Sequence, residues 1–122
     1  MDGYVDVFLL PVPKNRLAEY AKMSTAYGKI MKKYGVLDYR EFVGEDLKAK
    51  GMTAFPKRVN AKPGEVVVAA IIGYKSKTHR DQIRKKTHAD PKIIKMMAEY
   101  AKNNFLDMKR MSYGGFKTIV NP

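Results

Sequence analysis

An aspartate interrupts the apolar segment near the start of the chain. Asp6 stands in the stretch YVDVFLLPV, where strand alternation puts it on one face with Phe8 and Leu10. A carboxylate among apolar neighbours must be paired, hydrogen-bonded or protonated. Asp6 is therefore either a general base or substrate-anchoring group in a cavity, or half of an ion pair that fixes strand register or a dimer. The ion-pair partners that the sequence suggests are Arg40, Arg110 and Lys117.

Two adjacent glycines interrupt the last apolar segment, KRMSYGGFKTIV, at residues 109–120. Successive strand residues point to opposite faces, so Gly114 and Gly115 each open space on one side of a sheet. If this strand pairs with the first one and their centres are matched, Gly114, Gly115 and Phe116 lie level with Asp6. The glycines predict room for a ligand beside Asp6, or else a β-bulge or close packing.

Other polar residues complete a candidate site. Tyr113 and Arg110 flank the start of the last strand, where they can donate a hydrogen bond and bind an anion. Glu41 is a second carboxylate, on a strand polar enough for a sheet edge, where the alternative is a solvated charge. The prediction is a catalytic group of Asp6, Tyr113 and Arg110 and a ligand pocket that contains Glu41, Tyr74, Gly114, Gly115 and Phe116.

The chain offers few residues for metal or cofactor chemistry. It has no cysteine, and its two histidines, His79 and His88, lie nine positions apart, which matches no zinc-site spacing. No nucleophile elbow, phosphate-binding loop or dinucleotide fingerprint is present in the sequence. We therefore expect no metal and no cofactor. Such a pocket suits cofactor-independent oxygenation or isomerisation.

The order of the predicted elements is β-α-β-β-α-β. Strands are expected at residues 4–12, 36–43, 66–74 and 109–120, and helices over 13–35 and from 76 to about 101, with a break near 89. Gly35 is placed to end the first helix, and Ser76 and Asp90 to cap the two pieces of the second. The last piece has an expected apolar face of Ile93, Ile94, Met97, Tyr100 and Ala101.

Residues 44–65 mix turn-forming and basic residues, and their structure is the hardest to predict. A strand extension is expected around Lys57 to Ala61, and a turn at Pro63-Gly64. A segment of this length without regular structure is uncommon in a compact domain unless it has a function.

The element order predicts one α+β domain over residues 1–122, a ferredoxin-like protomer with an antiparallel sheet and central first and third strands. The stretch VVVAAIIGY is apolar on both faces, which is typical of a strand buried on both sides. Two helices cover only one face of such a sheet. We therefore expect a homodimer through the sheet face, which forms a dimeric α+β barrel. The alternative is that residues 44–65 fold back over that face.

Three stretches carry a resemblance to a known family: YVDVFLLPVPKNRLAEYAKM, YKSKTHRDQIRKKTHADP and KRMSYGGFKTIV. They resemble the small bacterial YbaA-type proteins, a family of unknown function within the dimeric α+β barrel superfamily, and the likeness extends over nearly the whole chain. It implies a ferredoxin-like protomer and a sheet-to-sheet dimer. The superfamily includes cofactor-independent monooxygenases, haem-degrading enzymes and isomerase-like proteins, and fold alone does not choose among them.

The composition indicates which classes of binding partner are favoured. The 122 residues are 45% hydrophobic and carry a net charge of +12, with lysines as 18 of the 24 basic residues. Lysine recognises phosphate less specifically than arginine does, so a solvated exterior is favoured over a nucleic-acid site. No apolar run approaches the roughly 18 residues of a membrane span, and a cytoplasmic location is expected. The main hypothesis is a small-molecule binder or enzyme; the alternatives are nonspecific nucleic-acid or anion binding through lysine-rich helices and a ligand-free structural or regulatory dimer.

Overall fold

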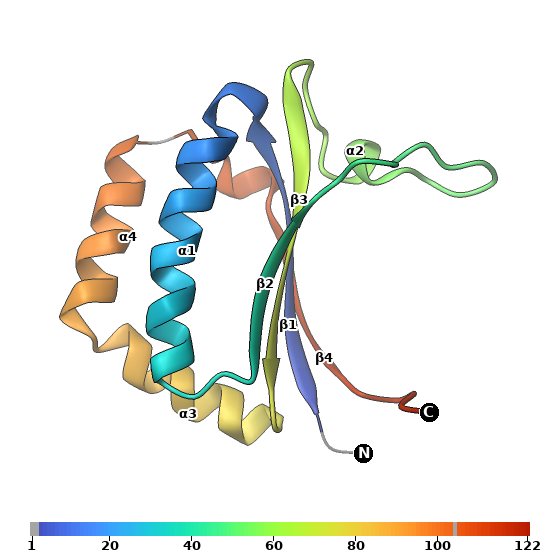
Figure 1. Ribbon diagram of the computed structural model, residues 1–122. Coiled ribbons are helices and arrows are strands. Elements are labelled where there is room, and N and C mark those ends of the chain that lie inside the picture. The colour runs from blue at the N-terminus through green and yellow to red at the C-terminus, as the bar shows by residue number, and fades with distance from the viewer. Residues whose placement is uncertain (1–2, 104) are drawn as a thin grey trace.

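The computed structural model describes residues 3–103 and 105–122, which form a four-stranded antiparallel sheet with the longer helices on one face (Figure 1). The strands are β1 (Tyr4–Pro13), β2 (Asp38–Val43), β3 (Glu65–Tyr74) and β4 (Ser112–Lys117). The helices are α1 (Leu17–Lys33), α2 (Phe55–Arg58), α3 (Lys77–His88) and α4 (Pro91–Asn103), with 3-10 turns η1 (Lys14–Arg16) and η2 (Met108–Arg110). The sheet order is β2-β3-β1-β4, so the first and third strands are central, as predicted.

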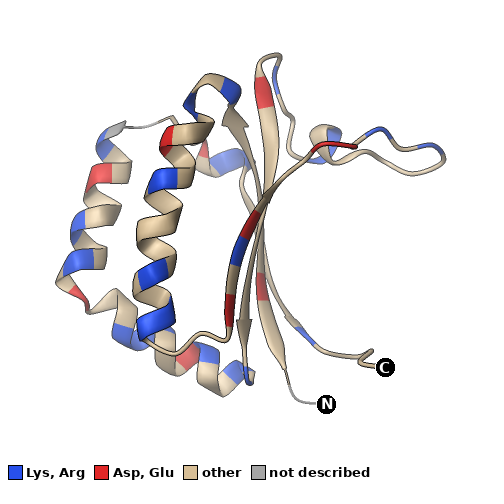
Figure 2. Cartoon of the chain, viewed as in Figure 1, with Lys and Arg blue, Asp and Glu red and all other residues tan. Residues whose placement is uncertain are grey.

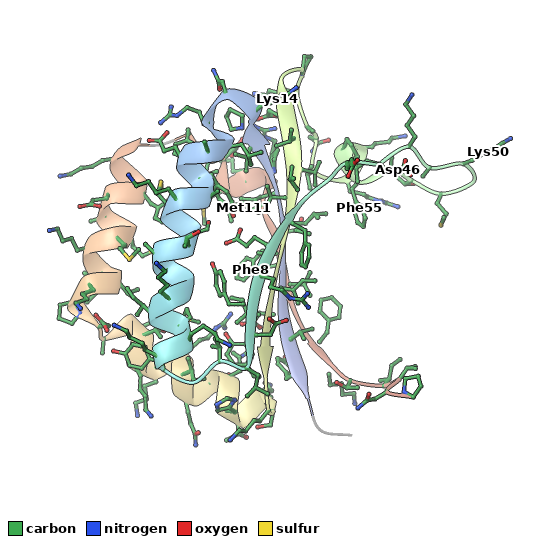
Figure 3. All side chains as sticks on the ribbon, in the orientation of Figure 1. Phe8, Lys14, Asp46, Lys50, Phe55 and Met111 are labelled. Carbon is green, nitrogen blue, oxygen red and sulfur yellow. The ribbon has the colours of Figure 1, made fainter. Side chains whose placement is uncertain are left out.

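The core lies between the sheet and the layer formed by α1, α3 and α4 (Figure 1). Alternate residues of β1 and β3 face this layer, and the side chains of Leu10, Val12 and Val68 are almost fully buried there. Phe8 and Met111 pack against the same cluster and lie on the helix side of the sheet in Figure 3. The period-two pattern of the central strands therefore fixes which side chains meet the helices.

The helix ends follow local signals in the sequence. Gly35 follows the last turn of α1 with φ +104°, a left-handed conformation that glycine adopts without strain. The Ser76 hydroxyl accepts a hydrogen bond from the backbone N–H of His79 at 3.1 Å and so begins α3. The Asp90 carboxylate accepts from the backbone N–H of Lys92 at 2.7 Å before α4. These three predicted helix boundaries are confirmed.

Two local predictions are wrong. Residues 57–61 do not extend a strand; Phe55–Arg58 forms one helical turn, α2, with a proline in its first turn, where a missing N–H costs nothing. The inward face of α4 is also rotated from the expected one, because Ile93 and Tyr100 face the core while Ile94 and Met97 are about half exposed.

The second face of the sheet has little cover. We call it the open face, and it carries Val5, Val7, Leu9, Arg40, Phe42, Ala69, Ile71, Gly114 and Phe116. The segment of residues 44–64 leaves the sheet on this side and carries Asp46, Lys50 and Phe55 (Figure 3). Its helix α2 packs against β3, and Val59 and Val67 are nearly fully buried. The segment thus covers only the end of the open face near Val67, and Phe42 and Phe116 stay exposed.

Candidate functional site

Asp6 lies on the helix side of the sheet at the centre of a hydrogen-bonded group that we call the Asp6 cluster: Asp6, Arg80, Arg84 and Tyr113. The Asp6 carboxylate accepts hydrogen bonds from Nη1 of Arg80 and from the Tyr113 hydroxyl, each at 2.8 Å, and from Nη2 of Arg84 at 3.5 Å. The Tyr113 oxygen accepts in turn from Arg80 at 2.6 Å and from Arg84 at 2.5 Å. The cluster therefore joins β1, β4 and α3.

The ion pair between Asp6 and Arg80 is almost completely buried. The side chains of Asp6 and Arg80 are 2% and 8% exposed, whereas that of Arg84 is 35% exposed. The Arg80 guanidinium lies over the Tyr4 ring, and its Nε donates to Asp81 at 2.7 Å. The positive charges of Arg80 and Arg84 thus face two carboxylates, those of Asp6 and Asp81, so the charges balance. Both oxygens of Asp6 have a partner.

The pKa values of the surrounding groups shift because of burial and of Asp6. Burial opposes the charge of Arg80, but the bonds to Asp81 and Asp6 outweigh it and raise the pKa of Arg80. Burial raises the pKa of Tyr113 and of Tyr74, and the nearby Asp6 carboxylate raises both further. Both phenols therefore stay protonated at neutral pH and can donate hydrogen bonds.

The three partners that the sequence suggests for Asp6 do not form the ion pair. Arg40 projects from the open face and pairs with Asp38 on its own strand. Arg110 lies at the far end of β3, where it holds Glu65 at 2.6 and 2.8 Å and Asp107 at 2.9 Å. Lys117 forms no ion pair within the described residues. The arginines of α3 take this place because α3 packs against β3, the neighbour of β1, and strand pattern alone does not encode this docking.

The two glycines of β4 are paired with β1 in continuous register. Gly115 lies opposite Asp6 and Gly114 opposite Val7, with no extra residue on either strand, so the predicted β-bulge is absent from the described pairing. A Cβ at Gly115 would lie 2.3 Å from the Tyr4 hydroxyl, and one at Gly114 would lie 3.0 Å from the Phe116 ring. The space that these glycines leave is filled by Tyr4 on the helix side and by Phe116 on the open face.

Glu41 belongs to a second polar group, between α1 and the edge strand β2. One carboxylate oxygen of Glu41 accepts a hydrogen bond from the Tyr20 hydroxyl, and the other accepts from the Tyr39 hydroxyl at 2.8 Å. No lysine, arginine or histidine of the described residues forms an ion pair with this carboxylate. The Glu41 carboxylate is therefore held in place by two neutral donors.

This carboxylate lines an open groove of about 740 Å³, which we call the Glu41 groove. The size is within the range of small-molecule sites, about 300–1,000 Å³. The walls come from one side of α1 and from β2, with Val68 of β3 below. The lining residues are Leu17, Tyr20, Ala21, Ser24, Thr25, Gly28, Lys29, Lys32, Lys33, Tyr39, Glu41, Phe42, Val43 and Val68.

Burial keeps the hydroxyls of Tyr20 and Tyr39 protonated, and a glycine on α1 leaves room for the Tyr39 ring. Burial raises the pKa of Tyr20 and of Tyr39, and the neighbouring Glu41 carboxylate raises both further, so each hydroxyl keeps its proton. A Cβ at Gly28 would lie only 2.6 Å from the Tyr39 ring. The absence of a side chain at Gly28 therefore lets α1 approach β2 closely enough for Tyr39 to lie against the helix.

The residues predicted to form one site lie in separate places in the structure. It brings Asp6 and Tyr113 into contact, with Tyr74 nearby and Gly115 opposite Asp6. Glu41 lies in the separate groove, Gly114 and Phe116 lie on the open face, and Arg110 lies at the other end of the sheet. Neither Asp6 nor Tyr113 lines the groove.

Sequence reasoning missed four partners: Arg80, Arg84, Tyr20 and Tyr39. The i, i+2 spacing of Tyr39 and Glu41 on one strand face was a usable signal for their hydrogen bond, because such residues share a face. Arg80 and Arg84 stand at i, i+4 on α3 and so project together, which was a second signal.

The described residues contain no group of three or more His, Cys, Asp or Glu side chains that is arranged to hold a metal ion. His79 has a local contact instead, since its Nδ1 accepts from the backbone N–H of Lys75 at 3.0 Å. Across the same residues, no helix combines the length and the apolar character needed to cross a bilayer.

Comparison with solved structures shows the fold. A NIPSNAP family protein from Agrobacterium tumefaciens superposes with a TM-score of 0.61 at 14% identity, over 96% of this chain and 86% of that one. A mutant of SnoaB, a cofactor-independent oxygenase from Streptomyces nogalater, superposes with a TM-score of 0.53 at 12% identity, over 99% and 97% of the two chains. At these identities the likeness shows the ferredoxin-like α+β fold and no substrate.

Sequence comparison shows the family. Residues 3–105 match the family described as a protein of unknown function, DUF1428. The uncharacterized protein YbaA from Escherichia coli is 34% identical over 118 residues, which cover 97% of each chain. The resemblance expected from the three sequence stretches is confirmed, and the chain belongs to the DUF1428 family of proteins of unknown function.

Proposed function

We propose that the chain forms a cytoplasmic homodimer in which each protomer binds a small organic molecule in the Glu41 groove. Glu41 accepts a hydrogen bond or a proton from the ligand, while Tyr20 and Tyr39 hold its carboxylate in place. The oxygenase activity named for SnoaB belongs to that protein. It supports only a class of chemistry, cofactor-independent oxygenation, that this fold can accommodate.

The observation that carries the proposal is a carboxylate without an ion-pair partner in an open groove. Most buried or half-buried acids have a basic partner, as Asp6 and Glu65 do here. Glu41 instead has two phenol donors, and the groove lies open beside it. A carboxylate of this kind can accept further hydrogen bonds, since its two oxygens together offer about four acceptor positions.

Asp6 is a weaker candidate for the reacting group. Its carboxylate is 2% exposed and has three donors already, so a ligand would have to displace an arginine to reach it. We therefore assign the acid–base role to Glu41 and a structural role to the Asp6 cluster.

The dimer is supported by the open face. Its apolar side chains include Val7 and Ile71, which are half-buried, and Phe42 and Phe116, which are 44% and 56% exposed. The segment of residues 44–64 covers only one end of this face. A second copy related by a two-fold axis would cover the rest, with the sheets face to face.

A fragment screen by ligand-observed NMR tests the groove. Three proteins are compared: the unmodified chain, Glu41→Gln, and Glu99→Gln, whose side chain is exposed on α4. Glutamine keeps the shape of Glu41 but removes the charge and replaces one acceptor oxygen by an NH2 donor, so one of the two tyrosine hydroxyls must turn and accept instead of donating. We expect fragments that bind the unmodified chain and Glu99→Gln and lose binding in Glu41→Gln. A screen in which no fragment depends on Glu41 would overturn the proposal.

A further inference from the structure

The Glu41 groove contains a second charged region, at the C-terminal end of α1. Lys29, Lys32 and Lys33 line this end. None of the three forms an ion pair with an acidic side chain of the described residues; Lys32 donates instead to the backbone oxygen of Leu37 at 3.1 Å. The groove thus carries three ammonium groups and one carboxylate, a lining that is positive overall.

The groove is long enough for a small molecule. Tyr20, which donates to Glu41, and Lys29 are nine positions apart on one helix, which is roughly 14 Å along the axis. Ala21, Ser24 and Thr25 of α1 line the groove between them and are small, so this part of the wall leaves room for a ligand, whereas the space at Gly28 is occupied by the Tyr39 ring.

Each region accepts one kind of ligand group. The hydroxyl protons of Tyr20 and Tyr39 are directed to Glu41, so the Glu41 carboxylate itself presents only lone pairs to a ligand and requires a hydrogen-bond donor. An ammonium group has three donors and no acceptor, so the lysine region requires an anion. The stretch between the two regions, lined on α1 by the small side chains of Ala21, Ser24 and Thr25, fits a slender hydrocarbon body.

We propose that the ligand is a hydroxy acid, whose hydroxyl donates to Glu41 and whose carboxylate lies among Lys29, Lys32 and Lys33. This inference rests on the proposed function and names the ligand class of the same groove. A neutral hydroxyl is favoured over an ammonium at Glu41 because the lining is positive overall and selects a ligand that is negative overall.

A matched series of probes tests the inference by isothermal titration calorimetry. The parent probe is 3-(4-hydroxyphenyl)propanoate, accompanied by aliphatic ω-hydroxy acids of graded length. Three analogues each change one group: 3-phenylpropanoate lacks the hydroxyl, the methyl ester lacks the anion, and 3-[4-(aminomethyl)phenyl]propanoate replaces the hydroxyl by an ammonium. We expect a hydroxy acid to bind and the first two analogues to bind about tenfold more weakly, the effect of one charged hydrogen bond.

Substitutions in the groove show whether the lysine region or the Glu41 region causes each difference in ligand affinity. Lys29→Gln combined with Lys33→Gln should weaken the hydroxy acid about tenfold and leave its methyl ester unchanged, because only the acid contacts the lysines. Glu41→Gln should weaken the hydroxy acid and leave 3-phenylpropanoate unchanged. Lys92→Gln, at an exposed position of α4 outside the groove, is the control and should change neither.

The possible failures are distinguishable. Equal binding of acid and ester, tighter binding of the ammonium analogue, or no binding of any hydroxy acid would each overturn the hydroxy-acid inference. If fragments still depend on Glu41 in the NMR screen, the groove proposal survives that failure. If no fragment depends on Glu41, the groove proposal and the ligand class fall together.

Discussion

Two carboxylates lie on the helix side of the sheet, and their partners give them different roles. Asp6 has two arginines and a tyrosine, whereas Glu41 has two tyrosines and an open groove. A buried carboxylate with full charge compensation stabilises the fold only while its partners remain, because either charge alone is costly to bury. A carboxylate with neutral partners is free to interact with an incoming ligand.

Asp6→Asn should destabilise the protein, because it leaves the Arg80 charge buried without its main partner. We expect a loss of about 3 kcal/mol in the free energy of unfolding, measured by urea denaturation. Asp81→Asn is the matched control, since Asp81 contacts the same arginine but its side chain is 56% exposed. That change should cost less than about 1 kcal/mol. Equal effects of the two changes would contradict the structural role of Asp6.

The Glu65–Arg110 pair predicts a pH dependence of stability. The Arg110 guanidinium donates two hydrogen bonds to Glu65 and holds the pKa of Glu65 at about 2. The folded chain therefore loses this proton more easily than the unfolded chain, and the resulting stabilisation is complete above the unfolded pKa of about 4.3. It is lost as pH falls towards 2, the folded value.

Urea denaturation of the unmodified chain and of Glu65→Gln, from pH 7 down to pH 2, measures this effect. The difference in the free energy of unfolding should be about 2 kcal/mol at neutral pH and should shrink below about pH 4. A difference that stays constant over the whole range would show that the pair does not stabilise the fold through the Glu65 charge.

At the residue scale, the sequence predicted neighbours along the sheet better than neighbours across the layers. Matched strand centres placed Gly114, Gly115 and Phe116 level with Asp6, and Gly115 does lie opposite Asp6, because this rule follows from backbone geometry. The arginines of α3 were missed because the angle at which a helix docks on a sheet depends on the packing of many side chains. The contact between Tyr20 of α1 and Glu41 was missed for the same reason.

At the scale of the elements, the contact between α1 and β2 depends on Gly28. Gly28→Ala would bring a Cβ to 2.6 Å from the Tyr39 ring. Overpacking of this kind costs about 1–3 kcal/mol, which the better helix propensity of alanine, about 1 kcal/mol, only partly offsets. We expect a net loss of stability in thermal or urea unfolding, together with weaker ligand binding in the Glu41 groove.

A double-mutant cycle separates the two contributions. In a Tyr39→Ala background the ring is absent, so Gly28→Ala should stabilise the protein by about 1 kcal/mol. If Gly28→Ala destabilises both backgrounds equally, the close approach of helix and strand does not explain the glycine.

Elements with strong local signals were predicted well, and those that depend on tertiary contacts were not. Gly35, Ser76 and Asp90 mark helix ends by their own conformational preferences. The rotation of α4 was misjudged because its sequence is apolar on two adjacent sides, Ile93 with Tyr100 and Ile94 with Met97. The one-turn helix α2 is too short for a periodic pattern to reveal it.

At the scale of the whole molecule, the two outer surfaces differ in charge and cover. Lysines and arginines are spread over α1, α3, α4 and the segment of residues 44–64, as Figure 2 shows. The open face is mainly apolar, with Arg40 near its β2 edge. This contrast favours the sheet, rather than the helix layer, as the surface that meets a second copy.

Ile71→Arg tests this assembly, since Ile71 lies between Val7 and Arg40 on the open face. Sedimentation velocity at micromolar concentration should show a dimer for the unmodified chain and a monomer for the variant, because a buried arginine without a partner is costly. Ile94→Arg, at the exposed side of α4, is the control and should remain dimeric. A monomeric unmodified chain would refute the dimer.

The pairing of the first strand with the last affects the order of folding. Asp6 and Tyr113 are 107 positions apart, so their contact closes one of the longest loops in the chain. Such closures are slow, because chain entropy is lost before the contact forms. During synthesis the arginines of α3 emerge before β4, so they can neutralise Asp6 first, and the last strand then docks against a charge that is already balanced.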